Sequence, residues 1–145
     1  MVRFQSIFWV SAQFFLVFLL LLLSRPWHGS GISILLGGLG SALALWVFVH
    51  NPPGNFRIRP EPKAHARLIT SGPYRWVRHP MYSALLLVTA ALPSQSSQIL
   101  PWAAWGLLGV VLTFKSSLEE RLLQQHWSEY AAYRTHTHRF IPFLW

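Results

Sequence analysis

Residues 7–23 form a run with no charged residue and no helix breaker, and no other feature of the chain restricts its fold as strongly. The run reads IFWVSAQFFLVFLLLLL. As an α-helix rising about 1.5 Å per residue, it nearly crosses the ~30 Å hydrocarbon core of a bilayer. A secretory signal peptide is the alternative, but the run exceeds the usual core of such peptides and no small-residue cleavage site follows it. The run therefore predicts a membrane-spanning helix.

Composition extends this prediction to the whole chain. Apolar residues make up 52% of the 145 residues and charged residues only 11%, whereas a soluble domain usually has about 25% charged residues. The formal charge of +8 is explained by basic loops beside anionic lipid headgroups, so we expect membrane lipids as partners and no nucleic acid. The chain has no cysteine, which excludes disulfides and thiolate metal sites.

Four apolar segments predict an all-α integral membrane protein with about four transmembrane helices. They cover residues 4–23, 32–50, 80–92 and 99–114. Small residues that would let a neighbouring helix approach closely gather early in the second segment. They are Gly37, Gly38, Gly40, Ala42 and Ala44. The third segment is short for a crossing, so it begins in the interface, thins the bilayer around it, or packs within the protein.

The tail after residue 114 is not a further crossing. Leu118, Leu122, Leu123 and Trp127 recur at helical spacing. This pattern predicts a cytoplasmic amphipathic helix to about residue 133, which either continues the fourth segment or lies in the interface. The whole chain, residues 1–145, is thus predicted to be one membrane domain. It has two helices in 1–50, a basic loop in 51–78, and a helical hairpin with a C-terminal helix in 79–145.

Basic residues orient the predicted helices. The connection between the second and third segments holds one acid, Glu61, against Arg57, Arg59, Lys63, Arg67, Arg75 and Arg78. The tail adds Lys115, Arg121, Arg134 and Arg139, whereas the other two connections contain only Arg25. Cytoplasmic loops are enriched in Lys and Arg. We therefore expect the basic connection, the tail and both termini to be cytoplasmic.

Glu119 and Glu120 follow the fourth segment directly. Neighbouring residues on a helix point about 100° apart, so the two carboxylates cannot face one environment. A carboxylate that faces inward is costly unless it meets a cation. The residues alone leave two interpretations open, a functional carboxylate or an interfacial salt bridge to Lys115 or Arg121.

A second candidate site lies at residues 71–82, SGPYRWVRHPMY. Gly-Pro predicts a turn, Pro80 suits the first turn of a helix, and His79 falls at the positive N-terminal end of that helix. Backbone N–H groups there suit a carboxylate or phosphate. Tyr74 and Tyr82 could flank a flat ring or a cation. A juxtamembrane aromatic belt with basic anchors is the alternative.

Two separated motifs, LITSGPYRWVRHPMY at 68–82 and EERLLQQHWSEYAAYRTHTHRFIP at 119–142, resemble the isoprenylcysteine carboxyl methyltransferase and phospholipid methyltransferase superfamily. The resemblance implies that both motifs meet at the cytoplasmic face, bind S-adenosylmethionine, and methylate a lipophilic acceptor that enters from the bilayer. The implied cofactor-binding residues are Leu68, Ile69, Tyr74, His79, Pro80, Met81, Tyr82 and Glu119. Glu119 would meet the cofactor's ammonium with Glu120 in support, while Lys115 and Arg139 occupy positions near the acceptor.

The chain departs from the superfamily pattern at positions that bear on the cofactor and on the acceptor. Ala66 stands where relatives often have a histidine, which bears on the cofactor contacts before Tyr74. Lys115 stands where prenyl-cysteine enzymes carry an arginine, which bears on the acceptor. The acceptor therefore stays open between a thiol, a carboxylate, a phospholipid amine and a small lipophilic metabolite. The oligomeric state also stays open. His136 and His138 alternate without a third ligand, so no metal site is expected.

Two further functional classes stay open at this point. Membrane sterol reductases, which use NADPH, resemble the same C-terminal region, and a non-catalytic scaffold could retain the same helices. Cofactor binding distinguishes these possibilities from a methyltransferase. By its size the resemblance fits a prokaryotic cytoplasmic membrane.

Overall fold

The protein is described by a computed structural model over residues 2–25, 28–51 and 68–144. Within these ranges the backbone forms helices and turns, with one isolated bridge between Val77 and His138 in place of a sheet. The long helices are α1 (Val2–Leu23), α2 (Gly31–His50), α3 (Pro80–Ala90) and α4 (Ile99–His126). Three short helices are η2 (Gly72–Arg75), η3 (Pro93–Gln95) and α5 (Tyr130–Thr135). The all-α prediction is confirmed, while most of the predicted basic connection, residues 52–67, lies outside the described residues.

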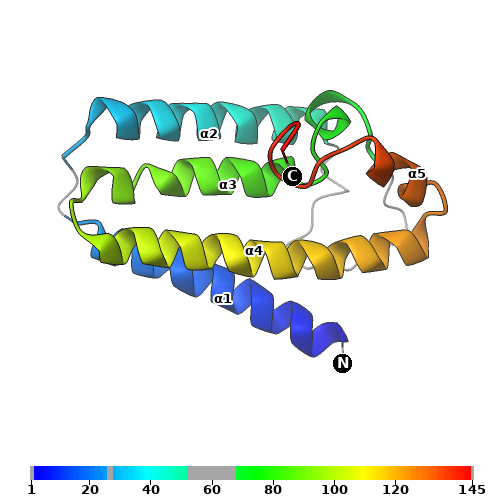
Figure 1. Ribbon diagram of the computed structural model, residues 1–145, viewed down its shortest axis with the longest axis horizontal. Helices are drawn as coiled ribbons and strands as arrows, with labels where there is room; N and C mark the ends of the chain where they lie inside the picture. The colour runs from blue at the N-terminus through cyan, green and yellow to red at the C-terminus, as the bar shows by residue number, and fades with distance from the viewer. Residues whose placement is uncertain (1, 26–27, 52–67, 145) are drawn as a thin grey trace.

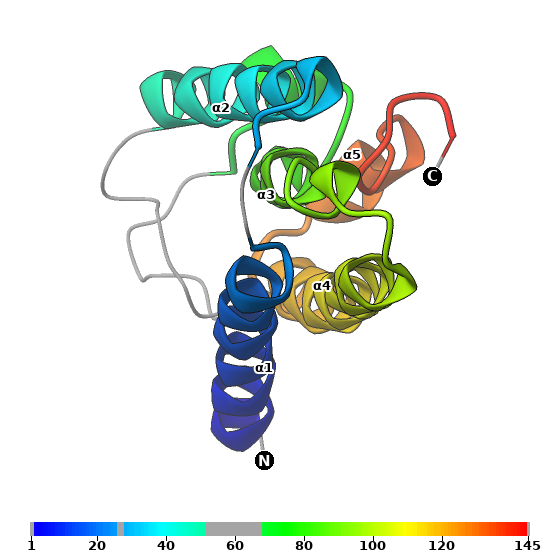
Figure 2. The ribbon, with the colours of Figure 1, turned by 90° about the vertical axis from the view of Figure 1, so that its left-hand side faces the viewer.

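The helices pack as two pairs joined through α3 and α4. Helices α2, α3 and α4 lie nearly parallel, and α1 crosses obliquely beside α4 (Figure 1). The view along the bundle places α3 between α2 and α4 (Figure 2). The end of the bundle where α2 stops, α3 begins and α4 leads into α5 is called the polar end below.

Helices α1 and α4 share the main apolar core. Leu20 of α1 and Leu108 and Leu112 of α4 are fully buried, and Leu16 is nearly so. Lipid tails are as apolar as leucine, so close van der Waals packing rather than water exclusion holds such a pair together. Phe140 from the tail joins the same core, which ties the C-terminal segment to the long helices.

Helix α2 contacts α3 most closely at Gly40. A Cβ atom added to Gly40 would lie 2.6 Å from the backbone nitrogen of Val88 and 3.0 Å from the carbonyl oxygen of Ala84. The added atom at Gly37 would make an ordinary 3.8 Å contact with Ala91, and at Gly38 nothing lies within 4 Å. The predicted close approach is therefore confirmed at Gly40, where two helix backbones meet.

Three of the helices, α1, α2 and α4, are long and apolar enough to cross a membrane among the described residues. Helix α3 has 11 residues, or roughly 16 Å at about 1.5 Å per residue, and is too short by itself. Its residues Ala84, Thr89 and Ala90 are buried, which favours the alternative that this segment packs within the protein. A fourth crossing remains a prediction.

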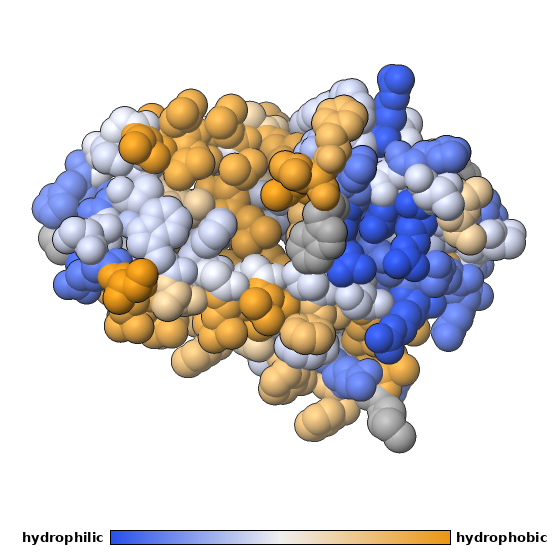
Figure 3. Space-filling model, in the orientation of Figure 1, coloured by the Kyte–Doolittle hydropathy of each residue, from blue (hydrophilic) through white to orange (hydrophobic). Residues whose placement is uncertain are grey.

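Figure 3 shows an apolar surface along the helices and hydrophilic side chains at both ends, with the most hydrophilic ones at the polar end. Large exposed side chains on α1 and α2 include Phe15, Phe18, Leu45 and Phe48. Soluble proteins rarely expose so much apolar surface to water, whereas lipid tails can cover it. The chain is therefore an integral membrane protein.

At the end of the bundle opposite the polar end, a glutamine links the α1–α2 connection to the α3–α4 connection. The side-chain carbonyl of Gln95 accepts hydrogen bonds from the backbone N–H groups of His28 and Gly29, each at 3.0 Å. The tail begins as a continuation of the fourth apolar segment, because α4 runs without a break to His126. The helix ends at His126, before the predicted residue 133, because Trp127 has an extended backbone. Helix α5 then follows as a separate helix.

Candidate active site

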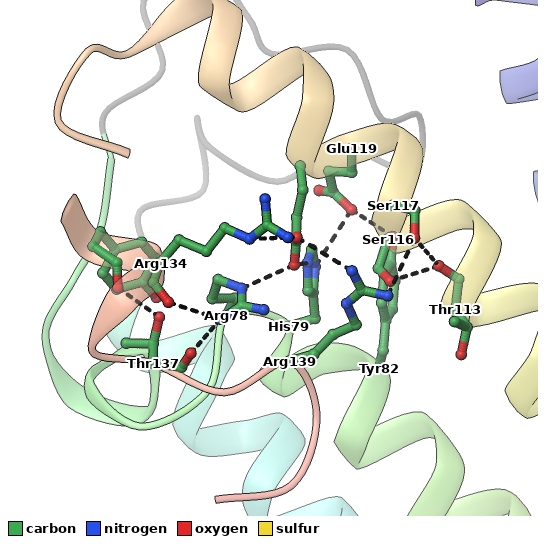
Figure 4. Close-up of polar contacts among 12 residues, drawn as sticks. Arg78, His79, Tyr82, Thr113, Ser116, Ser117, Glu119, Arg134, Thr137 and Arg139 are labelled. Carbon is green, nitrogen blue, oxygen red and sulfur yellow. Dashed lines mark hydrogen bonds and ion pairs between the residues drawn. The ribbon is translucent and has the colours of Figure 1, made fainter. Parts of the chain in front are cut away.

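Backbone pairing brings the C-terminal tail to the start of α3. The amide of Arg78 donates to the carbonyl of His138 at 2.7 Å, and the amide of His79 donates to the carbonyl of Arg139 at 3.1 Å. The hydroxyl of Ser83 donates to the carbonyl of Phe140 at 2.6 Å. The two motifs that are separated in the sequence therefore lie side by side at the polar end (Figure 4).

Glu120 is a buried carboxylate held by four basic side chains. Only 3% of its side chain is exposed. Its Oε1 accepts from Arg78 Nε at 2.9 Å and His79 Nε2 at 3.2 Å. Its Oε2 lies 3.4 Å from Arg139 Nη2 and 3.5 Å from Arg134 Nε. These partners come from the start of α3, from α5 and from the tail, so Glu120 joins three segments to α4.

Arg78 also contacts the end of α5 through its Nη1 atom. Its Nη1 donates to the carbonyl of Arg134 at 3.3 Å and to the carbonyl of Thr137. A guanidinium group carries five N–H donors in a planar fork, which suits one side chain to a carboxylate and two carbonyls. Arg78 therefore links the end of α5 and the start of the tail to Glu120 of α4.

Glu119 has different surroundings from its neighbour. Its side chain is 26% exposed, and its Oε2 accepts from the Tyr82 hydroxyl at 2.8 Å and lies 3.6 Å from His79 Nδ1. Among the described residues, Oε1 has no hydrogen bond. The imidazole of His79 thus lies between the two carboxylates, and neither glutamate forms the alternative interfacial salt bridge to Lys115 or Arg121.

Aromatic rings form one wall around Glu119. His79 and Tyr82 stack with their centroids 5.3 Å apart and their planes 4° from parallel. Phe140 meets both rings edge-on, at 6.0 Å from His79 and 6.1 Å from Tyr82. This wall offers flat apolar faces next to a carboxylate, an arrangement that attracts an organic cation.

Lys115 lies one helical turn before Glu119 and is 2% exposed. Its Nζ donates to the side-chain oxygen of Gln13 at 2.6 Å and lies 5.1 Å from the centroid of the Tyr82 ring. Gln13 belongs to α1, and the sequence did not single it out. An amide in the middle of a mostly apolar helix was the available signal, because polar groups inside membrane helices usually bind a partner.

Tyr74 is held by contacts from two other segments. Its hydroxyl accepts from Asn51 Nδ2 at 3.1 Å, and its carbonyl accepts from the Tyr133 hydroxyl at 2.7 Å. Burial raises the pKa of Tyr74 to about 12, the Asn51 hydrogen bond opposes the rise, and repulsion from Glu119 adds to it. The phenol of Tyr74 therefore lies within electrostatic reach of Glu119.

The turn before Tyr74 requires glycine. Gly72 has a φ of +58°, and an added Cβ would lie 2.6 Å from the His50 ring. Both the left-handed backbone and the ring above it exclude larger residues. The Gly-Pro turn predicted from the sequence is confirmed, and it joins the end of α2 to the start of the site.

The remaining predicted residues lie on the backbone around this cluster. Leu68 and Ile69 are half-buried in the segment that leads to η2, Pro80 is buried as the first residue of α3, and Met81 is half-buried beside it. Their predicted cofactor contacts stay predictions. In the part of the chain that the structure describes, no three His, Asp or Glu side chains are grouped to hold a metal ion.

A sequence profile of phospholipid methyltransferases matches residues 31–130, more than half of the chain. The chain belongs to the phospholipid methyltransferase family. The matched region of the chain includes His79, Tyr82 and both glutamates. Gln13, Arg134 and Arg139 lie outside it. A comparison with curated proteins found no match.

Family membership and apolar helices together support a membrane methyltransferase. The resemblance noted in the two sequence motifs is thereby confirmed. What the structure adds is the pairing of those motifs around the two glutamates and the histidine.

Proposed function

We propose that the chain transfers a methyl group from S-adenosylmethionine to a lipophilic acceptor at the cytoplasmic face of a membrane. The observation that supports this best is Glu119, a partly exposed carboxylate beside the stacked rings of His79 and Tyr82. The residues of this arrangement lie within the region that the phospholipid methyltransferase profile matches. A prokaryotic cytoplasmic membrane is the expected location.

The residues present fit the chemical groups of S-adenosylmethionine. The cofactor combines an ammonium, a carboxylate, a cationic sulfonium and an adenine ring. Glu119 is suited to the ammonium, because its Oε1 has no hydrogen bond among the described residues. The rings of Tyr74, His79 and Tyr82 are suited to the sulfonium and the adenine. The predicted use of the N-terminal end of α3 for the carboxylate is not supported, because the amides of His79, Tyr82 and Ser83 already donate within the protein and Pro80 has no N–H.

When bound, the cofactor supplies an electrophilic methyl group that an acceptor takes by in-line displacement. Such a step needs positioning more than covalent help. Tyr82 and His79 orient the carboxylate of Glu119, and Glu120 orients His79 through Nε2. Phe140 is buried against both rings and keeps water from that side. The protein's contribution is therefore orientation and exclusion of water.

Two particular acceptors are compatible with a lipophilic acceptor: the amine of a phospholipid and the carboxylate of an isoprenylated cysteine. The match to the phospholipid methyltransferase profile favours the amine. Vesicles that contain phosphatidylethanolamine, compared with vesicles that contain a prenylated cysteine, should receive labelled methyl from S-adenosylmethionine. Label in the first lipid alone would assign the amine, and label in the second alone would assign the carboxylate.

Calorimetric titration of the detergent-purified protein tests the cofactor. S-adenosylmethionine and S-adenosylhomocysteine should bind saturably, and NADPH should not. Binding of NADPH alone would favour a reductase. No binding of any of the three, by protein with an intact helical spectrum, would favour a scaffold.

Glu119→Gln should weaken cofactor binding by roughly 10- to 150-fold, because a charged partner in a partly buried site typically contributes about 1.5–3 kcal/mol. The measurement is the dissociation constant of S-adenosylmethionine. Glu129→Gln is the matched control, since the Glu129 side chain is exposed and, among the described residues, its carboxylate bonds to Ser128 alone. Equal affinity in Glu119→Gln and the parent would remove Glu119 from the site.

A further inference from the structure

The side chain of Asn51 at the end of α2 has an unexplained buried oxygen. Only 8% of the residue is exposed, and its Oδ1 has no hydrogen-bond partner among the residues that the structure describes. Its Nδ2 donates to the Tyr74 hydroxyl at 3.1 Å. A buried carbonyl left without a donor costs about 1–3 kcal/mol, and buried polar groups in proteins are nearly always paired. Such an atom points to a ligand donor.

The position of Asn51 relates it to the candidate active site. Its amide is bonded to Tyr74, which lies in the short helix η2 that leads to His79 at the start of α3. The neighbouring His50 bonds to Ser71 at 2.9 Å and packs on Gly72. The end of α2 is therefore fixed against the turn that carries Tyr74, so the direction of the Asn51 amide is set by the fold.

We propose that Asn51 is a further cofactor-binding residue, whose Oδ1 accepts a hydrogen bond from the 6-amino group of the adenine of S-adenosylmethionine. This inference rests on the proposed function. The cofactor has two N–H donor groups, and the cationic ammonium suits the carboxylate of Glu119 better than a neutral amide. Asparagine amides pair well with the amino edge of adenine, and the Tyr74 ring beside Asn51 is suited to stack on the base.

The test compares two ligands whose bases differ at the 6-position and in the hydrogen on the adjacent N1. S-adenosylhomocysteine carries the 6-amino group, and S-inosylhomocysteine carries an oxygen there and cannot donate from it. By calorimetry, the parent protein should bind the adenosyl ligand about tenfold more tightly, as one buried hydrogen bond is worth roughly 1–1.5 kcal/mol. Asn51→Leu should lose this preference, while Asn51→Asp, which keeps an acceptor oxygen, should retain it.

Ser71→Ala is the matched control for a loosened junction. It removes the nearby bond to His50 without touching the Asn51 amide, so it should keep the tenfold preference. Thermal melting of each variant accompanies the titrations. If Asn51→Leu does not fold, the parent and Asn51→Asp still decide the question, because equal binding of the two ligands by either protein would overturn the inference.

Failure of the inference and failure of the proposed function give different results. A parent protein that binds neither S-adenosylmethionine nor S-adenosylhomocysteine would overturn both. A parent that prefers the adenosyl ligand, with the same preference in a folded Asn51→Leu variant, would overturn the role of Asn51 alone.

Discussion

Glu119 and Glu120 are adjacent in the sequence and have opposite roles in the structure. Glu120 is 3% exposed and touches Arg78, His79, Arg134 and Arg139, so its charge is neutralised within the protein. Glu119 is 26% exposed, and its hydrogen-bonded oxygen is oriented by Tyr82. The first of the pair is thus suited to a ligand and the second to holding the site together.

Glu120→Gln should destabilise the protein by about 3–5 kcal/mol, because it removes the buried charge that neutralises several guanidinium groups. The measurement is a thermal melt in detergent, in which the melting temperature should fall markedly. Glu119→Gln should lower cofactor affinity with a much smaller change in melting temperature. A Glu120→Gln variant that melts with the parent would show that the arginines are neutralised elsewhere.

The sequence identified Glu119 and Glu120 as candidates but did not identify their partners. The angle between neighbouring helix residues already implied that one glutamate faces inward. The identity of that residue depends on the pairing of residues 76–79 with 138–140, which no local pattern shows. Asn51 and Gln13 were missed for the same reason, since Gln13 contacts Lys115 across 102 residues of sequence.

At the scale of helices, Gly40 sets the distance between α2 and α3. Gly40→Ala should destabilise the protein by about 1–3 kcal/mol, because the new methyl group overlaps backbone atoms of Val88 that cannot rotate away. Gly38→Ala is the control on the same helix, as open space surrounds its added Cβ. Thermal melts should show a lower melting temperature for Gly40→Ala only. Equal melting of both variants would contradict the close approach.

Helix bounds followed from apolar runs more readily than helix packing did. Membrane helices must satisfy their own backbone hydrogen bonds, so the predicted segments at 4–23, 32–50 and 99–114 agree closely with α1, α2 and the apolar part of α4. The glycines of the second segment looked alike in the sequence. Only the crossing with α3 distinguishes Gly40 from Gly38.

At the scale of the whole molecule, charge is concentrated at one end. Arg78, Arg134 and Arg139 all lie at the polar end, and the most hydrophilic side chains gather there (Figure 3). We propose that this end is cytoplasmic, by the excess of Lys and Arg in cytoplasmic segments. The candidate site would then face the compartment where S-adenosylmethionine is made.

The absence of cysteine makes this orientation easy to test. Ser128 lies after α4 at the polar end, and Ser97 lies in the connection before α4 at the opposite end; both are exposed. In an expression host, a membrane-impermeant maleimide should label Ser97→Cys in intact spheroplasts and Ser128→Cys only in inverted vesicles. The reverse pattern would place the polar end outside.

The hydrogen bond between Gln13 and Lys115 can form only late in the synthesis of the protein. A ribosome makes α1 before α4, so the amide of Gln13 enters the bilayer long before its ammonium partner exists. Until α4 inserts, that amide needs water, lipid headgroups or the insertion machinery as a substitute. A nascent chain arrested before residue 115 should therefore hold α1 less firmly in the bilayer than the completed protein does.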